Sequence, residues 1–187
     1  REVMGTNKIP VFAMPKMTSF LQNNGPWSQL VTLENIRLQK LKKDSTFYLN
    51  NNIKITPFLV PHRDEFSETV GYEIIINNKT LIFIPDIDKW EKWDRDIREL
   101  IQKTNYAFLD ATFYKNGELE RNMCEIPHPF VEESLEFFSE LAESDKAKVH
   151  FIHFNHTNPL LRDGGKAEKQ VLSKGFNLAK QGQIIKF

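Results

Sequence analysis

Hydrophobic residues occur along this chain in short runs, separated by turns rich in Gly, Pro, Asn and Asp. Runs rich in Ile, Val, Phe and Tyr are typical of β-strands, because β-branched and aromatic side chains pack well on a pleated surface. The pair Asn77-Asn78 lies between two such runs and predicts a hairpin over residues 72–84. The strands predicted in this way are residues 11–14, 53–60, 71–76, 80–84, 106–109, 149–154 and 183–187.

Helices are predicted where apolar residues recur at steps of three and four, which places them on one face of a helix. These segments are residues 16–23, 89–103, 130–142 and 166–174. An Asp after a strand and before a helix is often a helix N-cap, and Asp88 fits that role for 89–103 better than Asp86. Trp27, Trp90 and Trp93 are expected to pack in the core or on helices. A run of strands followed by strand–helix alternation predicts a mixed α/β fold with sheets covered by helices.

Composition narrows the class of protein. With 40% hydrophobic and 27% charged residues among 187, the chain is expected to form a single globular domain over 1–187. The formal net charge of zero does not indicate a nucleic-acid or anionic membrane partner. No apolar run approaches the roughly 20 residues of a membrane span, and no signal peptide is visible, so we expect a soluble chain, cytoplasmic rather than periplasmic. The single Cys124 excludes an intramolecular disulfide and a multi-cysteine zinc site.

Residues that can bind metals recur where the predicted strands end. His62 follows the strand 53–60, Asp86 follows 80–84 and Asp110 follows 106–109. The carboxyl end of a strand is where α/β sheets place functional side chains, because the strand fixes the residue and the loop leaves it accessible. Imidazole and carboxylate ligands suit zinc, iron or manganese. We therefore expect a metal site here, although His62 as a solvated loop residue and Asp86 as a helix cap remain open alternatives.

The second half of the chain holds further candidates. His153 is the strongest, because an alternating strand would otherwise bury it unpaired, and His156 is the alternative in the same stretch. His128 lies in the unusual polar turn Ile126-Pro127-His128-Pro129, and His150 is expected to be structural or exposed. Cys124 has no base at a diagnostic spacing and is expected to be an ordinary small side chain.

The order of these residues resembles the C-terminal two-thirds of a metallo-β-lactamase-fold hydrolase, which implies a four-layer αββα sandwich. Gly71-Tyr72-Glu73-Ile74 and Phe108-Leu109-Asp110-Ala111-Thr112 are among the motifs that carry this resemblance. Other motifs, spread over nearly the whole chain, include Val11-Phe12-Ala13-Met14-Pro15, His62-Arg63-Asp64-Glu65, Pro85-Asp86-Ile87-Asp88-Lys89-Trp90 and Ile152-His153-Phe154-Asn155. Together these motifs resemble the pyrroloquinoline-quinone biosynthesis protein B subfamily.

The resemblance also implies roles for single residues. His62 would bind a first metal, Asp86 would bridge two metals and His153 would bind the second. His128 would act as the general acid on the leaving group, and Asp110 would orient that His. One or two zinc ions are implied, with iron or manganese as alternatives, and the implied reaction is attack of a metal-bound hydroxide on an ester or phosphodiester in a small-molecule substrate.

One hallmark of that superfamily, the His-x-His-x-Asp-His motif, does not occur in this chain. Because the chain starts at Arg1 without a Met, we expect this motif, further metal ligands and the N-terminal strands of the fold to lie upstream. Two alternatives to hydrolysis stay open. One is an oxidative step in quinone-cofactor biosynthesis that uses a redox metal such as iron on the same residues. The other is a catalytically degenerate protein that binds or carries a small molecule.

Overall fold

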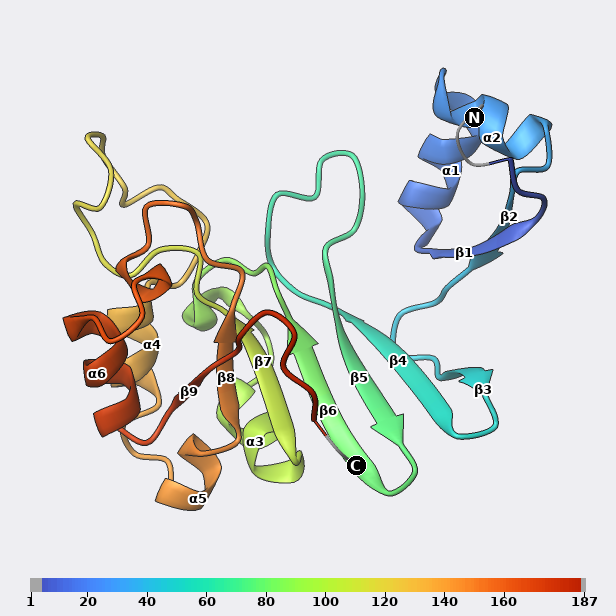
Figure 1. Cartoon of the computed structure of the whole chain (residues 1–187). Helices are drawn as coiled ribbons and strands as arrows, with labels where there is room; N and C mark the ends of the chain where they lie inside the picture. The colour runs from blue at the N-terminus through green and yellow to red at the C-terminus, as the bar shows by residue number, and fades with distance from the viewer. Residues whose placement is uncertain (1–4, 186–187) are drawn as a thin grey trace.

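The computed structural model describes residues 5–185, and within that range nine strands form two sheets (Figure 1). The smaller sheet pairs β1 (Ile9–Ala13) with β2 (Ile36–Lys40) in parallel, and the helices α1 (Pro15–Asn23) and α2 (Trp27–Thr32) lie between them in the chain. A stack of Phe12 on Phe47, with ring centroids 4.8 Å apart, joins this unit to the larger sheet.

The larger sheet has seven strands in the order β3-β4-β5-β6-β7-β8-β9. Neighbours from β3 to β6 are antiparallel, whereas those from β6 to β9 are parallel. Because two antiparallel steps separate β4 from β6, the strands β4, β6, β7 and β8 all end at the same edge of the sheet. The strand bounds are β3 (Phe47–Asn50), β4 (Ile53–Leu59), β5 (Val70–Ile76), β6 (Lys79–Ile84), β7 (Tyr106–Asp110), β8 (Val149–Ile152) and β9 (Asn177–Leu178).

Helices cover one face of the larger sheet. The main core joins buried residues of the central strands β6, β7 and β8 to buried residues of α3, α4 and α6. Ile84, Leu109 and Phe151 are among its fully buried side chains. The remaining elements are η1 (Trp90–Lys92), α3 (Ile97–Lys103), α4 (Val131–Phe137), α5 (Glu143–Lys146), η2 (Pro159–Leu161) and α6 (Lys166–Ser173).

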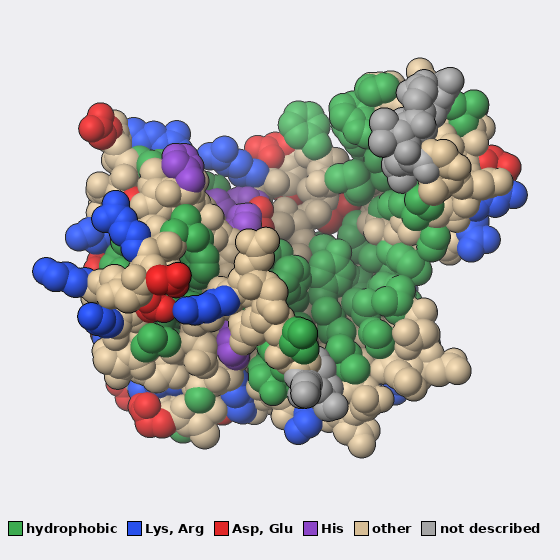
Figure 2. Space-filling view, viewed as in Figure 1, with side chains coloured by type: hydrophobic (Ala, Val, Ile, Leu, Met, Phe, Trp, Pro, Cys, Tyr) green, Lys and Arg blue, Asp and Glu red, His purple; other side chains and the backbone are tan. Residues whose placement is uncertain are grey.

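The opposite face of the sheet is apolar but lacks such a cover among the described residues. Tyr72 pairs with Phe83, and Ile74 pairs with Leu81, so that these side chains form half-buried apolar rows. Figure 2 shows hydrophobic side chains gathered over β4, β5 and β6, where a groove of about 320 Å³ lies. The larger sheet and its helices thus form two layers of the predicted four-layer sandwich, and the small unit of β1, β2, α1 and α2 lies beside them.

All strands predicted before residue 155 are present, with shifts of at most two residues at their ends. The predicted hairpin forms between β5 and β6, where Asn77 has a φ of +53°. Residues 183–185 form no strand, and residues 186–187 lie outside the described residues. The strands β2, β3 and β9 were not predicted, because they are short or rich in polar residues.

The largest difference from the predicted elements concerns the helix expected over 89–103. The α-helix begins only at Ile97, and its N-cap is Asp96, whose side chain accepts from the Arg98 N–H. The prediction that Asp86 or Asp88 caps this helix is therefore wrong. The helix predicted over 130–142 is also shorter, since α4 ends at Phe137.

The two buried tryptophans explain why 89–103 does not form one helix. The Trp90 indole N–H donates to Ser134 Oγ of α4 at 2.9 Å, and the Trp93 N–H donates to the Leu59 carbonyl of β4 at 3.0 Å. The two indoles thus bond to different elements, α4 and β4. The chain therefore forms the short helix η1 at Trp90–Lys92 in place of one continuous helix over 89–103. Trp27, by contrast, is 45% exposed on α2 and packs on α1 through Phe20, so this residue follows the predicted packing on helices and not the alternative of the core.

Candidate metal centre

The five predicted site residues lie together at the edge where β4, β6, β7 and β8 end. His62 follows β4, Asp86 follows β6, Asp110 ends β7, His153 follows β8, and His128 comes from the segment between β7 and α4. Potential ligand atoms of Asp86, Asp110, His128 and His153 all lie within 4.8 Å of one another. His62 joins them through its Nε2, which lies 2.9 Å from Asp86 Oδ1. The topology thus gathers two carboxylates and three imidazoles.

Asp110 is the buried anchor of the cluster, with a side chain that is 0% exposed. Its Oδ1 accepts from the Thr112 N–H at 2.8 Å and the Thr112 hydroxyl at 2.6 Å, and its Oδ2 accepts from His128 Nδ1 at 2.7 Å and from the Ile87 N–H at 3.2 Å. Burial raises the pKa of Asp110, but contacts with His128, His153 and Thr112 outweigh it and hold the pKa below its usual value. Both oxygens are thus occupied, which suits a positioning role better than metal binding.

Thr112 is a part of the site that the sequence did not single out. Its hydroxyl lies 3.0 Å from His153 Nδ1 and 3.2 Å from His128 Nδ1. Because its only proton goes to Asp110, this hydroxyl acts as an acceptor toward the imidazoles. When His153 donates from Nδ1, its Nε2 remains available as a ligand atom. A Thr two residues after a strand-end Asp, as in Asp110-Ala111-Thr112, was the only available signal.

The backbone at His153 has a φ of +64°, in the left-handed region that residues other than Gly rarely adopt. Such a conformation costs on the order of 1–3 kcal/mol and persists where the surrounding structure enforces it. The Asp110 carboxylate, 3.6 Å from His153 Nδ1, raises the pKa of His153 against the lowering effect of burial. The turn after β8 therefore holds an imidazole beside a buried negative charge.

Asp86 carries the strongest indication of a cation. Its Oδ1 is buried and has no hydrogen-bond partner in the described part of the chain, although His62 Nε2 lies 2.9 Å away and His128 Nδ1 lies 3.5 Å away. A buried carboxylate oxygen without a partner is costly unless a cation neutralises it. Close imidazole nitrogens around such an oxygen are the donor set that zinc, iron and manganese accept. The residues present therefore fit a metal ion.

Three other polar residues near the end of β8 or after it, His150, His156 and Asn158, lie outside the cluster. His156 is exposed, and its imidazole makes no hydrogen bond, ion pair or ring contact with residues 5–185. Asn158 is buried and donates to the Ala111 carbonyl at 2.8 Å, while its Oδ1 accepts from the Leu160 N–H at 3.0 Å. His150 is buried on the other face of the sheet, where it stacks on Phe108 with ring centroids 5.1 Å apart. Of these residues, the structure brings none into the cluster.

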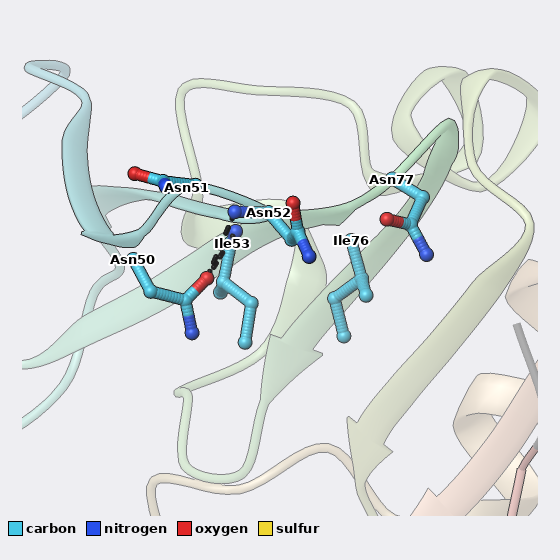
Figure 3. A pocket seen from close by; sticks show the side chains of 6 residues that line it. All are labelled: Asn50, Asn51, Asn52, Ile53, Ile76 and Asn77. Carbon is cyan, nitrogen blue, oxygen red and sulfur yellow. Dashed lines mark hydrogen bonds between the residues drawn. The ribbon is translucent and has the colours of Figure 1, made fainter.

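A hollow at the opposite edge of the sheet has no titratable side chain in its lining. It has a volume of about 530 Å³ and is lined by four Asn and two Ile at the tips of the hairpins (Figure 3). Asn50 Oδ1 accepts from the backbone N–H groups of Asn52 and Ile53, which stabilises the turn. None of its lining side chains is titratable, so the reactive groups lie at the other edge.

Comparison with known proteins agrees with this geometry. A family model described as the beta-lactamase superfamily domain matches residues 1–154, which include all the site residues named above. The chain belongs to this family. Within the family, the sequence is similar to the protein described as "Coenzyme PQQ synthesis protein B" from two strains of Acinetobacter baumannii. The identity is 21% over 170 residues for strain ACICU and 22% over 152 residues for strain SDF.

These alignments cover 80% and 72% of this chain, but only 55% and 49% of the relatives. The chain thus spans about half the length of the curated relatives that it matches.

Three solved structures share the fold of this chain. Zn(2+)-bound PqqB from Methylobacterium extorquens superposes with a TM-score of 0.79 at 18% identity, covering 100% of this chain and 65% of that one. The metallo-beta-lactamase fold protein YhfI from Bacillus subtilis gives a TM-score of 0.63 at 12% identity, with coverage of 97% and 66%. Unliganded yeast PDE1 gives 0.61 at 14% identity, with coverage of 94% and 59%. The predicted superfamily resemblance is confirmed.

No helix within residues 5–185 has the length and hydrophobicity to cross a membrane.

Proposed function

We propose that this protein is a metal-dependent hydrolase of the metallo-β-lactamase superfamily that cleaves an ester or phosphodiester in a small-molecule substrate, with residues 1–187 acting as a single domain. The observation that carries the proposal is the buried Asp86 Oδ1, which has no hydrogen-bond partner among the described residues and faces His62 Nε2 at 2.9 Å. The contact with His62 is at ion-pair distance but does not have the geometry of a hydrogen bond, which leaves this oxygen able to bind a cation.

We assign metal binding to His62, Asp86 and His153, with Asp86 as the bridge if two ions bind. His153 suits this role because Thr112 occupies its Nδ1 and leaves Nε2 free. Asp86 suits it because its Oδ1 has no competing hydrogen bond within residues 5–185. Zinc is the expected ion, with iron or manganese as alternatives. When bound, such an ion lowers the pKa of a water toward about 7 and stabilises negative charge on the substrate.

We assign proton donation to the leaving group to His128, with Asp110 as the residue that orients its imidazole. Asp110 accepts from His128 Nδ1 at 2.7 Å and thereby fixes the imidazole, so that Nε2 points away from the buried carboxylate. In this orientation, His128 holds a proton on Nε2 and donates it to the departing oxygen. Asp110 stays ionised and stabilises the charged imidazole before the transfer.

The metal assignment is tested by elemental analysis of the protein purified without chelator. We expect one to two metal ions per chain in the wild type and their loss in Asp86→Asn. Asp88→Asn is the matched control, because Asp88 lies two residues away but bonds to Lys92 at 2.8 Å and to the Lys89 N–H instead. A folded wild-type protein without metal, or an Asp86→Asn variant that keeps its metal, would contradict the proposal.

The role of His128 is tested separately. His128→Ala should retain its metal but hydrolyse a phosphodiester or ester with an alkoxide leaving group about 10²–10⁴-fold more slowly, as expected when a general acid is removed, whereas 4-nitrophenyl substrates, whose leaving group departs without a proton, should be much less affected. Loss of metal in this variant would instead make His128 a ligand.

A second candidate is an oxidative step in quinone-cofactor biosynthesis, and the similarity to Coenzyme PQQ synthesis protein B favours it. The same side chains suit iron. Iron in the purified protein and consumption of oxygen with substrate would support this candidate, whereas hydrolysis without oxygen by a zinc protein would exclude it. A well-folded protein without metal would point to a small-molecule carrier.

A further inference from the structure

A pocket of about 230 Å³ adjoins the metal centre. It lies between the β4–β5 loop and the segment that connects β7 to α4. Its lining includes His62, Thr112 and His128 of the centre, and it adds the side chains of Arg63 and Arg121. Figure 2 shows basic side chains next to His side chains along this upper edge of the molecule. A molecule in this pocket would therefore touch the centre and the two arginines at once.

Neither Arg63 nor Arg121 makes an ion pair or hydrogen bond with any residue from 5 to 185. Arg95 and Arg98 each bind a carboxylate, at 2.6 and 2.8 Å, whereas Arg37 on β2 has no ion-pair partner in the described range either. What distinguishes Arg63 and Arg121 is therefore their place in the same pocket. No carboxylate is among the residues that line the pocket. Two guanidinium groups without a carboxylate partner in one pocket are available to bind an anion.

The chemistry of the lining defines what would fit. A guanidinium group presents a planar fork of N–H donors that matches the oxygens of a carboxylate or a phosphate. Phe113 and Ile126 supply an apolar wall beside the arginines. The pocket thus combines a site for an oxyanion with a surface for the carbon skeleton next to it.

We propose that Arg63 and Arg121 are specificity-determining residues that bind an anionic group of the substrate, a carboxylate or a phosphate, and so hold the neighbouring bond over the metal centre. This inference rests on the proposed function, since it assigns the pocket to the substrate of that centre. Because the two arginines come from separate loops, binding of the anion also fixes the distance between these loops.

The first test measures binding of inorganic phosphate and of acetate by isothermal titration calorimetry at low ionic strength, without any turnover. Arg63→Gln and Arg121→Gln should each weaken binding of at least one of the anions by about tenfold or more, the loss expected for one charge-assisted contact. The anion that depends on both arginines identifies the group as phosphate or carboxylate. Arg37→Gln is the matched control, because Arg37 is exposed on β2 and has no ion-pair partner in the described range.

Metal analysis of the same preparations separates the two proposals. If the metal is present but both arginine variants bind the anions like the wild type, the anion site is overturned while the proposed function stands. If the wild type binds neither anion saturably, the anion site is overturned as well. Anion binding that is lost in Asp86→Asn but unchanged in the arginine variants also overturns it, because the ion is then the binding site. Arginine-dependent binding by a protein without metal would support the pocket and refute the proposed function.

Once an anionic substrate has been identified, KM and kcat of the arginine variants provide an independent test. Loss of a binding group raises KM more than it lowers kcat when the contact is made equally in the ground and transition states. We expect Arg121→Gln to raise the KM for a carboxylate-bearing ester relative to that for 4-nitrophenyl acetate. An equal change for both esters would contradict a role in binding the anion.

Discussion

Asp110 Oδ2 and His128 Nδ1 are 2.7 Å apart, and the Asp110 side chain is fully buried at the end of β7. The carboxylate also accepts from two backbone N–H groups, of Ile87 and Thr112. One residue thus links the ends of β6 and β7 to the segment that carries His128. Its removal should affect stability as well as catalysis.

Asp110→Asn tests this link. An amide keeps the shape of the side chain but presents an N–H₂ group to donors, so at least one buried donor loses its partner. We expect the free energy of unfolding to fall by about 3 kcal/mol, as measured when one partner of a buried pair is removed. Urea unfolding provides the measurement. Asp163→Asn, at a 94% exposed side chain, is the control and should change stability by less than about 0.5 kcal/mol. Equal stability of the two variants would refute the anchoring role.

Gly71 at the start of β5 is predicted to tolerate no side chain. A Cβ at this position would lie 2.7 Å from Phe58 Cζ and 2.9 Å from Ile84 Cγ1. The Phe58 ring is itself packed on Trp93, so it has little room to move. Gly71→Ala should therefore cost about 1–3 kcal/mol of unfolding free energy through overpacking. Gly25→Ala, where no atom lies within 4 Å of the added Cβ, is the comparison, and a similar loss in both variants would contradict the steric explanation.

Ser134 on α4 is predicted to matter through one hydrogen bond. Its hydroxyl accepts from the buried Trp90 indole N–H at 2.9 Å. Ser134→Ala leaves that donor without a partner, which should cost about 1–3 kcal/mol in thermal or chemical unfolding. Ser139→Ala removes an exposed hydroxyl near the end of the same helix and should be close to neutral. A neutral Ser134→Ala would mean that the indole finds another acceptor.

His150 should make stability depend on pH. Burial lowers its pKa below 6.5 in the folded protein. As the pH falls below about 6.5, the unfolded chain takes up a proton on this residue while the folded protein does not, so the unfolding free energy decreases until the lower folded pKa is reached. His150→Phe should flatten this part of the profile. Unfolding titrations between pH 7.5 and 5, with His156→Asn as the exposed control, measure the effect, and an unchanged slope in His150→Phe would contradict it.

The sequence by itself determined where the strands end and which His and Asp side chains lie at those ends. His62, Asp86, Asp110 and His153 could be assigned to strand ends because alternating apolar runs and their polar breaks are local features. The buried role of Trp90 followed from the same kind of pattern. Thr112, in contrast, had only its place two residues after a strand-end Asp as a local signal, and this place does not reveal its contacts with the imidazoles. Its role follows from two imidazoles that come from distant parts of the chain.

The distances between these strand ends were decided only by the tertiary structure. The order β4-β5-β6-β7-β8 brings the carboxyl ends of four strands to one edge, and this order depends on pairings between residues far apart in the chain. The same holds for the late start of α3 at Ile97, where two indoles that bond to separate elements override a helical pattern. The pocket between Arg63 and Arg121 likewise exists only where two loops meet. A local pattern encodes an element and its end, whereas a site depends on how non-local packing places those ends.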